Sequence, residues 1–159
     1  MKRSIRKGLG FGLNSGVITT LGMMVGLSAS THSRLAVIGG IIAIAISDAF
    51  SDAVGIHISE EAEHRHSERE IWEATVSTLV SKFSIALTFV IPVLAFGLQT
   101  AIVVSVVWGL AMVAIFSYYL AVRQGVRPSK VLSEHVTIVV LVIVVTHYVG
   151  KWVGKFCYR

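Results

Sequence analysis

The sequence predicts an all-α integral membrane protein with five transmembrane helices. Three observations support this fold class: 54% of the 159 residues are hydrophobic, only 14% are charged, and the hydrophobic residues lie in long runs. A soluble domain carries about 25% charged residues. Together with a mean hydropathy of +0.76, this composition excludes a disordered chain and argues against a soluble enzyme.

The placement of the charges indicates which partners to expect. The formal net charge is +5, but the basic residues cluster at the ends of the apolar segments, which is typical of a membrane protein and not of a nucleic-acid patch. The single cysteine, Cys157, excludes an internal disulfide and a cysteine-based metal cage. We therefore expect the lipid bilayer as a partner and no nucleic acid. The sequence has no phosphate loop, nucleophile elbow or HExxH motif, so we do not expect an enzyme.

The first predicted span covers residues 8–30. Its 23 residues suffice to cross a hydrocarbon core of roughly 30 Å. Because basic residues precede this run, a cleavable signal peptide is the alternative interpretation. The run is too long for the apolar region of a signal peptide, and no small-x-small cleavage site follows it, so we predict a true first span.

Four more spans are predicted further along the chain. The 40 residues from Phe83 to Val122 carry no charge, and at about 1.5 Å per residue this run is twice as long as a bilayer is thick. It must therefore fold back, and residues 97–100 are predicted to form a tight hairpin turn. Pro92 is expected to kink the third span. The predicted spans are residues 35–58, 76–97, 100–122 and 134–153.

Five spans place the two termini on opposite sides of the membrane, so the basic residues can test the orientation. With the N-terminus in the cytosol, ten basic residues lie in inner segments and four in outer ones, as the positive-inside rule requires. Lys82 is expected to extend toward the inner interface. The inner residues are Lys2, Arg3, Arg6, Lys7, Arg65, Arg69, Lys82, Arg123, Arg127 and Lys130, and the outer ones are Arg34, Lys151, Lys155 and Arg159.

Small residues in the first span predict how that helix packs. Gly8, Gly12 and Gly16 recur every four residues, and stripes of this kind let two helix backbones approach closely in lipid. We expect this stripe to pack against another helix. A candidate is the same helix of a second copy, in a homodimer.

Two aspartates interrupt the second span. Asp48 and Asp52 are four residues apart, so they share one face of the helix. A carboxylate inside a membrane helix costs roughly 2.5–3.5 kcal/mol on insertion scales, and such residues commonly mark ion or proton pathways. We therefore predict an intramembrane metal site at Asp48 and Asp52.

The longest polar stretch, residues 59–73, follows on the same face. Since no proline or glycine interrupts it, the second helix is predicted to extend into the cytosol over residues 59–75. Glu63, His66 and Glu70 would form a capture site there, because oxygen and imidazole ligands suit Fe²⁺, Mn²⁺, Zn²⁺ or Co²⁺. The alternative is a solvated helix stabilised by ion pairs between residues four apart.

The first span carries a weakly polar face, which we predict to line the ion pathway. It consists of Asn14, Ser15, Thr19 and Met23. The thioether of Met23 could bind a soft ion, although packing is the commoner use of such a methionine.

These segments resemble those of the vacuolar iron transporter family. Residues 5–20 are similar to that family's opening segment, which contains Gly-Leu-Asn-Asp-Gly, and residues 49–59 resemble its second-helix motif Ile-Ser-Met-Ala-Leu-Gly-Glu-Tyr-Leu-Ser. Residues 91–92 and 146–150 also fit its third and fifth helices. The resemblance extends over nearly the whole chain.

Three positions depart from the family's motifs. Ser15 stands where the family has aspartate, Asp52 where it has methionine, and Ile56 where it has glutamate. Only residues 59–73 occupy the place of the family's separate cytosolic metal-binding domain, so the chain resembles a short prokaryotic-type member. Our hypothesis is that Asp48 and Asp52 replace the usual aspartate and methionine at the intramembrane site.

The resemblance also implies an assembly and a function. It implies a cytosolic N-terminus, an outer C-terminus and a homodimer with first helices at its interface. The substrate would be a divalent transition-metal ion, with iron and manganese as the leading candidates. It would leave the cytosol across a prokaryotic cell membrane in exchange for protons. No covalently bound cofactor is expected. The alternative function is a non-transporting metal sensor or assembly partner of the same fold.

Overall fold

The computed structural model describes residues 3–157, and within them every regular element is an α-helix. Five helical segments are long and apolar enough to cross a membrane, with α3 and α4 together forming the third. The predicted number of five membrane-spanning helices is therefore confirmed. The helices are α1 (Arg3–Thr31), α2 (Arg34–Ala62), α3 (Glu68–Thr88), α4 (Val90–Ala95), α5 (Leu98–Gln124) and α6 (Pro128–Cys157).

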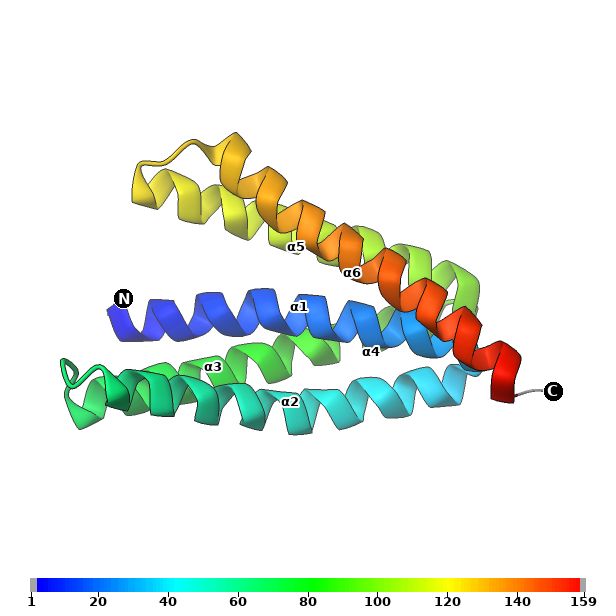
Figure 1. Ribbon diagram of the computed structural model, residues 1–159, viewed down its shortest axis with the longest axis horizontal. Helices are drawn as coiled ribbons and strands as arrows, with labels where there is room; N and C mark the ends of the chain where they lie inside the picture. Colours follow the sequence, from blue (N-terminus) through cyan, green and yellow to red (C-terminus); the bar gives the residue numbers. More distant parts are fainter. Residues whose placement is uncertain (1–2, 158–159) are drawn as a thin grey trace.

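Helix α1 lies in the middle of the bundle (Figure 1). It runs between the α2–α3 pair on one side and the α5–α6 pair on the other. The chain starts at one end of the bundle, together with the turns at residues 63–67 and 125–127, and ends at the other. We call these the N-terminal end and the C-terminal end of the bundle.

The hairpin between the third and fourth spans lies at the C-terminal end of the bundle. Only Phe96 and Gly97 separate α4 from α5, so the predicted turn is confirmed, with residues 98–100 already in the first turn of α5. The predicted kink at Pro92 is confirmed as well. Proline cannot donate to the carbonyl four residues earlier and its ring clashes there; that carbonyl belongs to Thr88, where α3 ends.

The second helix does not continue over residues 59–75, which corrects the sequence prediction. Helix α2 ends at Ala62, and His64 adopts a positive φ of 48° in the turn that follows. Ser67 then starts α3 as its N-cap: the Ser67 side chain accepts from the Glu70 N–H, and the Glu70 side chain accepts from the Ser67 N–H. This reciprocal capping box stabilises a new helix start, so the third span begins at residue 68 and not at 76.

The glycine stripe of α1 packs against α3 of the same chain. A Cβ atom added at Gly12 would lie 2.7 Å from the carbonyl oxygen of Thr78, and one at Gly8 would overlap Ser77 Oγ. Gly16 lies against the Lys82 side chain. The predicted close helix packing is confirmed, but α3 takes the place expected for a second copy, because the three glycines are already covered within the protomer.

Candidate functional site

A cluster of charged side chains lies between α1, α2 and α3, within the apolar part of the bundle. Asp48 and Asp52 project from successive turns of α2, Lys82 projects from α3, and Ser15 projects from α1. We call these four residues the ion cluster. Gly16 allows it to form, because the α1 backbone passes directly over the Lys82 side chain.

Lys82 occupies the centre of the ion cluster. Its Nζ lies 2.6 Å from Asp48 Oδ2 and forms a second ion pair with Asp52 Oδ2. It also donates a hydrogen bond of 2.9 Å to Ser15 Oγ, and Ser15 Oγ donates one of 2.6 Å to Asp52 Oδ2. One ammonium and one hydroxyl thus connect three helices.

The burial of Lys82 corrects the expectation that it extends to the interface. Its side chain is 2% exposed, whereas the side chains of Asp48 and Asp52 are 25% and 21% exposed. A buried ammonium is tolerated only when it is paired and hydrogen-bonded. Two carboxylates and a hydroxyl meet that need. The attraction of Lys82 to these partners therefore outweighs the hydration that its ammonium would gain at the membrane surface.

The two aspartates are brought together as predicted, but the cation between them belongs to the protein. Within residues 3–157, no group of three or more His, Cys, Asp or Glu side chains stands ready to hold a metal ion. In this conformation, Asp48 and Asp52 use their facing oxygens on Lys82. A metal ion can bind there only if the ammonium moves aside.

A second charged group lies at the N-terminal end of the bundle. Glu60, at the end of α2, is 2% exposed and pairs with Lys7 of α1. His66 Nε2 lies 3.4 Å from Glu60 Oε2 and 3.3 Å from Glu63 Oε2. Together with Arg3, Ser4 and Glu70, these side chains line a cavity of about 90 Å³, which we call the acidic pocket. The predicted capture residues Glu63, His66 and Glu70 are therefore neighbours, although Glu63 and His66 follow α2 in the turn and Glu70 lies in the first turn of α3, not on one continuous helix face.

Glu70 has a structural role within the acidic pocket. It accepts hydrogen bonds from both the backbone N–H and the hydroxyl of Ser67. These bonds favour the ionised carboxylate and hold the pKa of Glu70 below its ordinary value. The carboxylate that caps α3 is thus engaged before any cation arrives.

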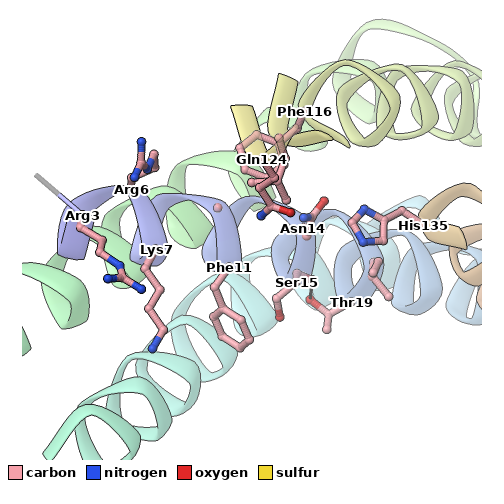
Figure 2. Close-up of a pocket in the computed structure, with 13 residues that line it drawn as sticks. Arg3, Arg6, Lys7, Phe11, Asn14, Ser15, Thr19, Phe116, Gln124 and His135 are labelled. Atoms are coloured by element: carbon pink, nitrogen blue, oxygen red, sulfur yellow. Dashed lines mark hydrogen bonds between the residues drawn. The ribbon is translucent and has the colours of Figure 1, made fainter. Parts of the chain in front are cut away.

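A larger cavity of about 710 Å³ lies between the N-terminal half of α1 and the α5–α6 pair (Figure 2). We call it the basic cavity, because Arg3, Arg6 and Lys7 line it. Three of the predicted pathway residues lie on its wall: Asn14, Ser15 and Thr19. That this face of α1 lines an ion pathway stays a prediction.

Met23 lies elsewhere. It packs beside Gly40 of α2 and against the hydrophobic core, so it fills space between helices and does not line the basic cavity. The core is formed by Val17, Leu21, Met24, Val37, Ile41, Phe89, Val93, Ala101, Val113 and Val139.

Sequence reasoning missed two residues of these sites, Lys82 and Glu60. Glu60 lies eight residues after Asp52, with Ile56 between them at the four-residue spacing, so the helical period places Glu60 near the same face. The sequence signal for Lys82 was weaker: it is a single basic residue in the third span, and the second span carries two aspartates that could pair with it.

Comparison with known proteins matches the first part of the chain to one family. The sequence model of the VIT family matches residues 9–74. This segment contains most of α1, all of α2 and the start of α3, and with them Ser15, Asp48, Asp52 and Glu60, but not Lys82. No curated protein matches the chain.

Proposed function

We propose, from the membership of the VIT family that this match supports, that the protein moves divalent transition-metal ions out of the cytosol in exchange for protons. Membership of this family implies membrane metal-ion transport. The choice of iron or manganese as the substrate, the direction of movement and the proton coupling are our proposal.

The observation that carries the proposal is the pair of carboxylates at Asp48 and Asp52, held within the apolar part of the bundle. Carboxylate oxygens are ligands for hard and borderline divalent cations. Lys82 now neutralises part of their charge. An arriving divalent ion would take the position of the Lys82 ammonium and bind both carboxylates.

Proton exchange follows from the same carboxylates. An intramembrane carboxylate can carry a proton or contribute to a metal site, so loading of one expels the other. The acidic pocket supports the supply of ions from the cytosol, because Glu60, Glu63 and His66 place oxygen and imidazole groups beside one another at the N-terminal end.

Transport is tested with purified protein in liposomes that contain a Mn²⁺-sensitive dye. We expect Mn²⁺ to enter faster when the interior is acidic, and Asp52→Asn to abolish this entry. Glu134→Gln, which removes an exposed carboxylate from the start of α6, is the matched control and should retain it. The transport proposal is contradicted if Fe²⁺, Mn²⁺, Zn²⁺ and Co²⁺ all fail to enter with or without a pH gradient. Unchanged entry in Asp52→Asn contradicts the site.

The position of Lys82 between Asp48 and Asp52 favours a second candidate function. Because Lys82 satisfies both aspartates, the resting state is stable without a metal ion, as expected of a metal sensor or an assembly partner. The liposome experiment distinguishes a transporter from a sensor. A sensor would show a rise in Tm with Mn²⁺, because the metal binds the folded state, while Mn²⁺ entry stays at the level of empty liposomes.

We also propose that the protein is a homodimer in a prokaryotic cell membrane. The glycine stripe of α1 is covered by α3, so the contact must use another face. Light scattering of the detergent-solubilised protein gives the mass of the assembly, and a monomer mass at all concentrations would contradict the dimer.

A further inference from the structure

The basic cavity has a charge opposite to that expected of a cation path. Arg3, Arg6 and Lys7 lie at its N-terminal end, and none of its lining residues is an aspartate or glutamate. Lys7 extends toward α2, where it pairs with Glu60, while the Arg6 side chain points away from α2 (Figure 2). Arg3 and Arg6 have no ion-pair partner within residues 3–157. Arg3 also lines the acidic pocket beside Glu60 and Glu63, but both guanidinium groups lie at the rim of the basic cavity, where they would repel a divalent cation.

The rest of the wall is largely apolar. Phe11 and Ile18 of α1 face Phe116 and Leu120 of α5 across the cavity. The lining residues of α1 begin at Arg3 and end at Thr19, which corresponds to about 24 Å along the helix at 1.5 Å per residue. The cavity is therefore elongated along α1, with its cations at one end, and its length suits a chain-like guest better than a small ion.

We propose that the basic cavity binds one anionic phospholipid, with its phosphate at Arg3 and Arg6 and an acyl chain along Phe11, Phe116 and Leu120. Guanidinium groups bind phosphate through paired N–H donors, and basic residues beside a transmembrane helix attract anionic lipids. The apolar walls favour a lipid over free phosphate. This proposal rests on the cavity and does not depend on metal transport.

The test uses the full-length protein in detergent, with phosphatidylglycerol and phosphatidylcholine of identical acyl chains as the probes. We expect native mass spectrometry to show one retained phosphatidylglycerol per protomer and Tm to rise with that lipid alone. The double variant Arg3→Gln/Arg6→Gln should bind it about 30-fold more weakly. Arg127→Gln removes one exposed charge at the same end of the bundle, outside the cavity, and should leave binding unchanged.

A second variant separates the lipid from a free anion. Leu120→Trp adds bulk to the apolar wall without changing a charge, and we expect it to reduce retention of phosphatidylglycerol. Inorganic phosphate should raise Tm little in any variant. The proposal is overturned if phosphatidylcholine is retained equally, if Arg127→Gln weakens binding as much as the double variant, or if inorganic phosphate stabilises the protein as much as the lipid.

Discussion

Lys82 shows how a single charge organises the interior of this bundle. The ammonium is shared by two aspartates of α2 and by the hydroxyl of Ser15 on α1. Breaking a buried ion pair by removing one partner costs about 3–5 kcal/mol, because a buried charge is left without compensation. The ion cluster is therefore both a candidate cation site and a contact that joins three helices.

The first prediction concerns the coupling between Lys82 and Asp52. We expect Lys82→Met to lower the free energy of unfolding by about 3 kcal/mol, because two carboxylates then face each other without a cation. The double variant Lys82→Met/Asp52→Asn should lose less than the sum of the two single variants. Chemical denaturation in detergent micelles measures all four proteins.

The control for this cycle is Lys130→Met, which removes an exposed lysine at the N-terminal end of the bundle. We expect it to change the free energy of unfolding by less than about 0.5 kcal/mol. Additive effects of Lys82→Met and Asp52→Asn would show that the two side chains do not interact as the structure indicates.

At the residue scale, the sequence predicts the two aspartates but not their partner. The four-residue spacing places Asp48 and Asp52 on one face of their own helix. Which face of the third span meets them depends on helix rotation, and rotation is set by the contacts of Gly8, Gly12 and Ser81 between α1 and α3. Spacing along one helix carries no information about those contacts, so Lys82 could not be placed.

Close packing of α1 on α3 is the main contact at the scale of the elements. We predict that Gly12→Ala destabilises the protein by about 1–3 kcal/mol, because its Cβ would collide with the Thr78 carbonyl oxygen and Ser81 Oγ. Gly55→Ala is the matched control, since a Cβ there meets nothing within 4 Å. It should instead stabilise α2 by up to about 1 kcal/mol through helix propensity.

Thermal unfolding in detergent compares the two alanine variants. Opposite signs of the change in Tm support the α1–α3 contact. Equal stability of Gly12→Ala and the unchanged protein would mean that α1 and α3 are further apart than described.

The ends of the helices were less predictable than their number. The apolar runs specify five crossings, because a charge within them is costly in lipid. The break between α2 and α3 comes instead from the capping box of Ser67 and Glu70, a Ser-x-x-Glu pattern that is visible in the sequence. The absence of proline and glycine in this stretch favours one long helix. The capping hydrogen bonds of Ser67 and Glu70 outweigh that tendency and start a new helix.

At the scale of the whole molecule, the odd number of crossings places the two ends of the chain at opposite ends of the bundle (Figure 1). Cys157 is exposed at the C-terminal end and is the single cysteine of the chain. We predict that a membrane-impermeant maleimide labels Cys157 from outside intact cells. Cys157→Ser is the negative control.

The same reagent tests the other end of the bundle. Arg127→Cys in the Cys157→Ser background places a thiol in the turn between α5 and α6. It should react only after the cells are made permeable. Labelling with the reverse pattern would show that the N-terminus is outside, against the positive-inside count.

Ser15 belongs to two sites at once, since it lines the basic cavity and bonds to Lys82 and Asp52. The contents of the cavity therefore set the local dielectric constant around the ion cluster. Water beside Ser15 screens the charges, whereas an acyl chain strengthens their attraction several-fold. If the basic cavity holds a lipid, as proposed above, lipid composition is a variable of the ion cluster itself, and transport assays in two different bilayers would compare two different electrostatic environments.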